Sequence, residues 1–245
     1  MDRRVILVAV ALIAGATIGV DAQTFPDPQA QREAQELHRA GLKFLAAEQF
    51  DRAVDAFSSA IAKDSLLSGA YYGMGQAYMN LQRFSDAAKA YAGCIEASRA
   101  LHTMQQTNQF DVDKRREEEI RALRTILNDL RGIREPTRLQ MEQHLRDLEN
   151  QRRTIGGAFR PPAEVLLALG SAHFKNGERD AAEGEWKAAA DANPKLGEAH
   201  NNLAVIYMQT GRLEEAEQSL KQAEKAGFRV NPQFKEDLKK KKSGH

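Results

Sequence analysis

The sequence contains a single cysteine, Cys94, among its 245 residues. One cysteine excludes an intramolecular disulfide and any zinc site built on several thiolates. A lone thiol in a helical protein usually behaves as a small apolar group, so we expect Cys94 to be buried and unreactive.

The motifs of known catalytic and cofactor sites are also lacking. None of the six histidines belongs to an H-E-x-x-H pair or stands at zinc-ligand spacing from a second ligand. The sequence contains no glycine-rich phosphate loop, no G-x-S-x-G serine motif and no C-x-x-C-H haem motif. We therefore predict no catalytic residue, no metal site and no cofactor, and we interpret the protein as a non-enzyme.

The sequence also lacks an excess of positive or negative residues. Lys and Arg total 35 and Asp and Glu total 34, which gives a formal net charge of +1. This balance gives no reason to expect a nucleic-acid partner, since such proteins carry a basic surface. The basic run 239–242 lies at the extreme end, where we expect a solvated tail; docking on acidic lipid or nucleic acid is the alternative.

Proline is scarce, at 7 residues, while hydrophobic residues reach 42% and charged residues 28%. Such a composition suits helices with one apolar stripe and one wet face. The sequence therefore predicts an all-α protein.

A long apolar run occurs only at the N-terminus. Asp2-Arg3-Arg4 precedes the apolar stretch 5–20, and Val20-Asp21-Ala22 places modest or small residues before a cleavage point. This order is typical of a secretory signal peptide. We predict a signal peptide over 1–22 and a periplasmic or secreted protein. An uncleaved N-terminal membrane anchor is the alternative.

An internal repeat with a period of 34 residues dominates the rest of the chain. Two separate parts of the sequence show it, each through pairs of small or aromatic residues. The matched pairs are Gly41 and Gly75, Ala53 and Ala87, Phe44 and Tyr78, Phe57 and Tyr91, Gly177 and Gly211, Ala182 and Ala216, and Ala189 and Ala223. A fixed period of this length indicates stacked supersecondary units.

The third unit illustrates the physical pattern. Leu166, Leu169 and Gly170 share one helix face, and a turn follows at 176–177. The second helix of the unit carries two small residues, Ala182 and Ala189, and the large Trp186 on one face. Its end is set at 193–194, because a residue before proline is disfavoured in the α region. The small residues allow two antiparallel helices to approach closely, and Trp186 fills the space between them.

The same slots are filled in four units, and they resemble the tetratricopeptide repeat family. Unit 1 (34–67) has Leu37, Ala40-Gly41, Phe44, Ala53, Phe57 and Ala60; unit 2 (68–101) has Tyr71, Met74-Gly75, Tyr78, Ala87, Tyr91 and Cys94; unit 3 (163–196) has Leu166, Leu169-Gly170, His173, Ala182, Trp186 and Ala189; unit 4 (197–230) has His200, Leu203-Ala204, Tyr207, Ala216, Leu220 and Ala223. Only unit 3 ends in the family's proline. The resemblance implies a solenoid of helical hairpins that binds other polypeptides.

Residues 102–162 interrupt the period between two repeat pairs. Their apolar residues recur at steps of three and four, in two arms: Ile120, Leu123, Leu127 and Leu130, then Met141, Leu145 and Leu148. This spacing predicts a coiled-coil-like helical hairpin that projects from the solenoid or packs along it. Two interpretations stay open: the seam closes the hairpin on itself, or it forms a dimerising or partner-binding coiled coil.

Residues 231–245 follow the last unit. Asn231-Pro232 is a favourable helix start, and Phe234 and Leu238 lie one turn apart. We predict a capping helix over the last repeat and a basic tail, since solenoid ends need covers.

By the resemblance, the fifth, ninth and twelfth residues of each unit line a ligand groove. In unit 1 these are His38, Leu42 and Leu45, of which the leucines also suit a core. The predicted partner-binding residues in the other units are Tyr72, Gln76, Met79, Leu167, Ser171, Phe174, Asn201, Val205 and Met208. Their mixture of apolar groups and amides suits a peptide held by shape and apolar burial.

The sequence thus predicts an exported, non-catalytic scaffold that binds a protein or peptide in this groove. The alternative is a structural component of an envelope assembly, which forms oligomers through the inserted hairpin. The oligomeric state stays open.

Overall fold

The computed structural model describes residues 27–105, 109–129, 135–151 and 158–243. Within these ranges the chain forms eleven helices and no strand, which confirms the all-α prediction. The predicted signal peptide lies outside the described residues, as does Leu130 of the predicted seam. In the described ranges no helix combines the length and the apolarity that crossing a bilayer requires.

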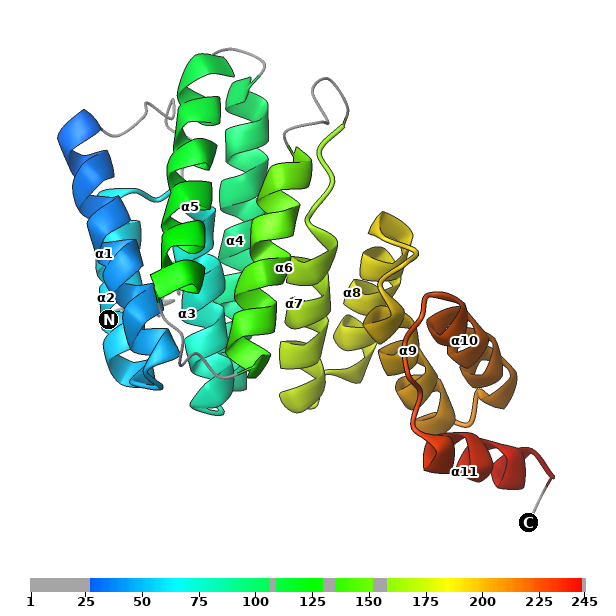
Figure 1. The fold of residues 1–245 in the computed structure, drawn as a ribbon. Coiled ribbons are helices and arrows are strands. Elements are labelled where there is room, and N and C mark those ends of the chain that lie inside the picture. The colour runs from blue at the N-terminus through cyan, green and yellow to red at the C-terminus, as the bar shows by residue number, and fades with distance from the viewer. Residues whose placement is uncertain (1–26, 106–108, 130–134, 152–157, 244–245) are drawn as a thin grey trace, which may run out of the picture.

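Eight of these helices form the four antiparallel pairs of the solenoid (Figure 1). The pairs are α1 (Pro28–Ala46) with α2 (Phe50–Lys63), α3 (Ser68–Asn80) with α4 (Phe84–Gln105), α7 (Ala163–Lys175) with α8 (Arg179–Ala192), and α9 (Gly197–Gln209) with α10 (Leu213–Lys225). Each pair packs on the next, α2 on α3, α4 on α7 and α8 on α9. The solenoid is therefore continuous across the insertion.

The close approach of helices explains the small residues of the repeat. A Cβ on Gly170 would lie 2.6 Å from Cδ1 of Trp186, and a Cβ on Gly41 would lie 2.6 Å from the ring of Phe57. Ala182 is completely buried. Large aromatic groups thus fill the space that glycine and alanine leave between paired helices.

A left-handed residue ends the first helix of every unit. Gly177 and Gly211 take φ values of +86° and +76°, whereas Glu48 and Gln82 take 58° at the equivalent positions of units 1 and 2. Only glycine adopts this conformation without steric cost. The turn geometry is therefore imposed by the helix packing even where the local residue opposes it.

The inserted hairpin consists of α5 (Gln109–Asp129) and α6 (Glu135–Gln151), and it packs along the solenoid over the first two units (Figure 1). Its apolar seam shares one core with α1, α2 and α3. The buried seam residues are Ile120, Leu123, Ile126, Met141 and Leu148, with Leu127 and Leu145 at the margin. The described seam residues thus join α5 and α6 to each other and to the solenoid in one core.

Helix α11 (Pro232–Ser243) packs against α10 at the end of the stack. Leu238 is buried and Phe234 half-buried in the core that runs through units 2 to 4. The side chain of Asn231 accepts a hydrogen bond from the amide of Gln233 (2.9 Å), as an N-cap does. Lys242 of the basic run forms an ion pair with Glu217 of α10, so this part of the run is docked on the solenoid.

Candidate functional site

The nine predicted groove residues differ in their accessibility. The six in units 3 and 4 are half-buried: Leu167, Ser171, Phe174, Asn201, Val205 and Met208. Met79 is also half-buried, whereas Tyr72 and Gln76 retain only 5% and 3% of their exposure. We call the six residues of units 3 and 4 the open groove.

The inserted hairpin covers His38, Leu42, Tyr72 and Gln76 of the predicted groove in units 1 and 2. A small cavity lies between the hairpin and the solenoid. The solenoid lines it with His38, Leu42, Tyr72 and Gln76, among others, and the hairpin lines it with Leu123, Met141 and His144. Leu42 and Leu45 are core residues, with 3% and 1% exposure. We call this first-helix face of units 1 and 2, with Asp64 beside it, the covered groove.

An ion pair fixes the position of α5. Nη1 of Arg115 lies 2.6 Å from Oδ2 of Asp64, and the two side chains are only 9% and 3% exposed. The other carboxylate oxygen of Asp64 accepts a hydrogen bond from the amide of Leu66 (3.0 Å). The loop of Asp64 therefore holds the carboxylate in the orientation that receives the guanidinium of Arg115. A charge-assisted hydrogen bond of this kind is stronger than a neutral one.

One helical turn further along α5, Glu119 reaches the first turn of α3. Its Oε1 lies 3.0 Å from Nε2 of His144 on α6, and a side chain on Gly69 would overlap its carboxylate. Burial by itself would raise the pKa of Glu119, but the hydrogen bond and charge of His144, with the charges of His38 and Arg116, lower that pKa below its ordinary value. The carboxylate also lies at the positive end of α3, where negative charge is favoured.

Helix α6 contributes two contacts to α3. The ring of His144 stacks on Tyr72, with centroids 4.9 Å apart and planes 13° from parallel. Nε2 of Gln76 donates a hydrogen bond to Oε1 of Gln140 (3.0 Å). The predicted groove residues Tyr72 and Gln76 thus bind the chain's own hairpin.

His38 lies beneath these contacts and retains 1% of its exposure. Its pKa is lowered to about 4, mainly by burial and with help from the charges of His144 and Arg39, while the charge of Glu119 opposes the shift. Its Nδ1 has no hydrogen-bond partner, and its ring lies 5.8 Å from that of Phe57. His38 is therefore neutral at pH 7 and is a poor place for a positive charge.

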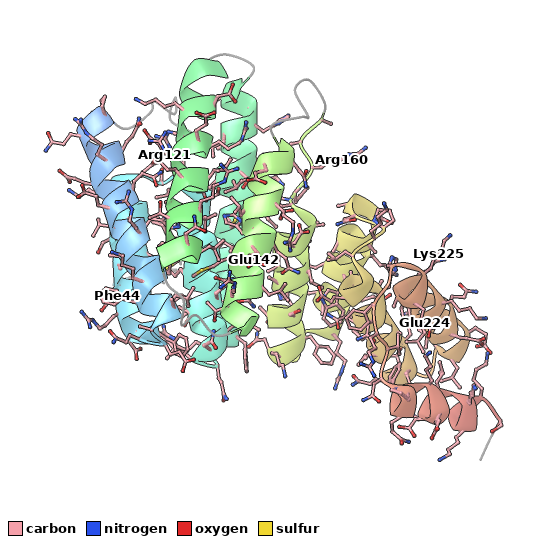
Figure 2. The ribbon with its side chains drawn as sticks, in the orientation of Figure 1. Phe44, Arg121, Glu142, Arg160, Glu224 and Lys225 are labelled. Carbon is pink, nitrogen blue, oxygen red and sulfur yellow. The ribbon has the colours of Figure 1, made fainter. Side chains whose placement is uncertain are left out.

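The sequence interpretation missed the polar members of this interface. Arg115 and Glu119 stand in a stretch dense in charge, which favours the prediction of a solvated face. The available signal was their spacing: they lie eight and four residues before Leu123, in the register of the seam. Arg121 of α5 and Glu142 of α6 lie outside that register (Figure 2); Arg121 is exposed, and Glu142 pairs with Arg138 of its own helix.

The open groove combines apolar side chains, which we call its floor, with acidic groups at the start of the same helices, which we call its edge. Phe174 packs against Trp186, with ring centroids 5.4 Å apart, and Oγ of Ser171 donates to the carbonyl of Leu167 (2.8 Å). Glu164 and Glu198 occupy the first turns of α7 and α9. Burial, followed by the charge of Glu164, raises the pKa of Glu198.

Asp147 of α6 joins this edge and connects the hairpin to unit 3. Burial, followed by the hydrogen bond and charge of Glu164, raises the pKa of Asp147 well above its ordinary value. Asp147 is therefore protonated at neutral pH, since burial and a neighbouring carboxylate both disfavour its charged form.

Reactive groups are otherwise sparse. Burial, followed by the charge of Glu119, raises the pKa of Cys94, so this buried thiol is a poor nucleophile. Among the residues that the structure describes, no group of three or more histidine, cysteine, aspartate or glutamate side chains is placed to hold a metal ion.

The family model described as Tetratricopeptide repeat matches residues 38–100 and 167–228, which make up just over half of the chain. These two segments coincide with the two repeat pairs and leave out the hairpin. No curated protein matches the chain significantly.

Solved structures give weaker similarity. MamA is 19% identical, with a TM-score of 0.29 and coverage of 76% of this chain and 94% of that one. The thermophilic TPR protein TTC0263 of Thermus thermophilus is 20% identical, with a TM-score of 0.32 and coverage of 85% and 98%. YrrB, a TPR protein with an unusual peptide-binding site, is 18% identical, with a TM-score of 0.29 and coverage of 82% and 88%.

Overall superposition on these structures is poor, so the assignment rests on the repeat match and on the four antiparallel helix pairs. By both, this chain belongs to the tetratricopeptide repeat family.

Proposed function

We propose that this protein is an exported, non-catalytic scaffold whose open groove holds a segment of a partner polypeptide. Membership of the family supports a role in protein–protein interaction. The observation that carries the choice of site is accessibility: the groove residues of units 3 and 4 are half-exposed, while Tyr72 and Gln76 are covered by the hairpin.

The chemistry of the open groove describes the segment it would hold. Val205 and Met208 offer apolar contact, Asn201 offers an amide, and Glu164 and Glu198 supply acidic groups at one edge. A segment with aliphatic side chains and one Lys or Arg would match these groups, because complementary charge sets specificity and register.

Partner capture from envelope extract tests the site. We expect Asn201→Asp and Met208→Asp to lose most of the partner recovered by the wild-type protein, since each places a charge in the apolar floor. The exposed Gln218→Asp on α10 adds the same charge outside the groove and is the matched control. Melting temperatures of all three show whether they fold. Equal recovery by folded groove variants and control would reject the open groove as the site.

Export rests on the charged start and the apolar stretch of the first 22 residues. We expect the mature protein to begin at Gln23, and N-terminal sequencing of the protein from an envelope fraction measures this. A mature protein that retains residue 1 in the membrane fraction would favour the anchored alternative.

Assembly through the hairpin is the second candidate function, and it has less support. The described seam residues are buried against units 1 and 2, and among the described residues Leu139 is the large apolar side chain left exposed, at 45%. Light scattering over a wide concentration range distinguishes the two roles. A stable oligomer of the wild-type protein that is lost in the Leu139→Asp variant would favour assembly.

A further inference from the structure

The face of α5 that enters the covered groove carries a simple pattern. Arg115, Glu119 and Leu123 follow one another at four-residue intervals, so they form a single stripe along the helix. Arg115 reaches Asp64, Glu119 reaches Gly69, and Leu123 lines the cavity over the floor of the groove. A cation, an anion and an aliphatic group each meet a matching position on the solenoid.

The positions that receive this stripe are specific. Asp64 is only 3% exposed on its side chain and already held by Leu66, so it requires a buried cation. Gly69 has no side chain, and a Cβ there would overlap the Glu119 carboxylate. His144 stacks on Tyr72 and contacts that same carboxylate. The surface is therefore shaped for a helix that carries these groups in this order.

The solenoid does not depend on the hairpin for its continuity. Helix α4 packs directly on α7, and one apolar core runs through units 2, 3 and 4. The hairpin is held over units 1 and 2 by apolar residues, by the buried Arg115–Asp64 ion pair and by the Gln76–Gln140 hydrogen bond. Buried ion pairs fix position well, but desolvation offsets much of their attraction. A ligand that presents the same groups competes with a tethered hairpin, so it binds more tightly once the contacts of the hairpin are weakened.

We propose that the covered groove is a docking site for an amphipathic helix that presents Arg-x-x-x-Glu-x-x-x-Leu on one face, and that α5 occupies this site in cis. A partner helix with this stripe gains access when the hairpin is displaced. The inference goes beyond the proposed function, because it concerns units 1 and 2 and not the open groove.

Competition with a peptide tests the proposal. The probe is a fluorescent synthetic peptide of residues 109–151, added to the full-length protein. The opened receptor carries Arg115→Ala, Glu119→Ala and Leu123→Ala in its own hairpin. We expect the opened receptor to bind the peptide at least about tenfold more tightly than the wild-type protein, because its own hairpin competes less.

A substitution in the groove supplies the control for specificity. Gly69→Ala in the opened receptor should weaken peptide binding at least about tenfold, since it fills the place of the Glu119 carboxylate. Gly184→Ala, on α8 with open space around it, should leave binding unchanged. A peptide with Glu119→Lys should fail to bind. Equal binding by wild-type and opened receptors, or no effect of Gly69→Ala, would overturn the proposal.

Hydrogen exchange of the wild-type protein gives a second measurement that needs no variant. We expect amides of α5 and α6 to exchange at least about tenfold faster than those of α3, since a displaceable element opens before the solenoid. Equal protection of α5, α6 and α3 would also overturn the proposal. Met208→Asp should leave peptide binding unchanged, so this proposal and the role of the open groove fail independently.

Discussion

The carboxylate of Glu119, on the inserted helix α5, lies in the space that a side chain on Gly69 of α3 would fill. Both residues are buried, and His144 completes the contact at 3.0 Å from Oε1 of Glu119. Glycine at the start of α3 is therefore a requirement of the hairpin and not of the helix, because alanine is the better helix former.

This relationship predicts the effect of two glycine substitutions. Gly69→Ala should lower the free energy of unfolding by about 1–3 kcal/mol, because the added Cβ overpacks the contact with Glu119. Gly184→Ala meets nothing within 4 Å and should raise it by about 0.5–1 kcal/mol. Urea denaturation of both variants measures the difference. A Gly69→Ala protein as stable as Gly184→Ala would mean that α5 does not pack on α3 in solution.

His38 predicts a loss of stability in mild acid. Its pKa falls from 6.5 to about 4 on folding, so the native state binds fewer protons than the unfolded state between these values. Stability is complete above pH 6.5 and declines as the pH falls toward 4, by up to about 3 kcal/mol from this residue. Glu119 and His144 face His38 from the hairpin, Arg39 adjoins it on α1, and Gly69 contacts it from α3.

A His38→Gln variant isolates this contribution, since glutamine is polar but does not titrate. Its free energy of unfolding should change less than that of the wild-type protein between pH 6.5 and pH 4. The comparison cancels the carboxylates that both proteins share. Parallel pH curves for the two proteins would show that His38 is not buried in its neutral form.

The raised pKa of Asp147 predicts the opposite dependence of stability on pH. Burial and the neighbouring Glu164 raise its pKa, so the native state holds a proton that the unfolded state releases above pH 3.8. Stability from this residue therefore falls as the pH rises through that value toward the raised pKa. Asp147→Asn removes the requirement for a proton and should stabilise the protein by about 1 kcal/mol or more at pH 8, with little effect at pH 4.

The control for this prediction is Asp191→Asn, which neutralises an exposed carboxylate on α8. It should change stability by less than about 0.5 kcal/mol at either pH. Thermal melts at pH 4 and pH 8 are sufficient to compare the two variants. An equal gain from Asp147→Asn at both values would contradict the raised pKa of Asp147.

The left-handed turns predict stabilising substitutions. Glu48 and Gln82 hold φ values of 58° where units 3 and 4 have glycine. Glu48→Gly and Gln82→Gly should each raise the free energy of unfolding by about 0.5–1 kcal/mol, because relief of the Cβ contact outweighs the added chain entropy. The reverse change, Gly177→Gln, should lower it by a similar amount. Loss of stability in both glycine variants would show that these turns relax in solution.

Much of the solenoid was predictable because its physics is local. Close helix pairs require small residues opposite large ones, and Gly170 facing Trp186 shows this within a single unit. The turn glycines Gly177 and Gly211 recur with the period of the repeat. Repetition therefore indicated the four helix pairs of the solenoid.

The site was less predictable. The positions of Leu167, Asn201 and Met208 followed from their place in each unit, and the structure leaves them half-exposed. Those of Tyr72 and Gln76 followed in the same way, but nothing in the repeat indicated that Gln140 and His144 would cover them. The spacing within a segment shows which residues share a face, but it does not show which distant segment will cover that face.

The sequence by itself determined that the chain forms helix pairs with one apolar face each, and that α5 and α6 carry an apolar seam. Only the tertiary structure decided where that seam is buried. Apolar attraction has no direction, so the spacing of Leu123 and Met141 does not distinguish a partner hairpin from units 1 and 2. The Arg115–Asp64 ion pair and the Gln76–Gln140 hydrogen bond join the hairpin to units 1 and 2, because directional contacts form only where the fold brings both groups together.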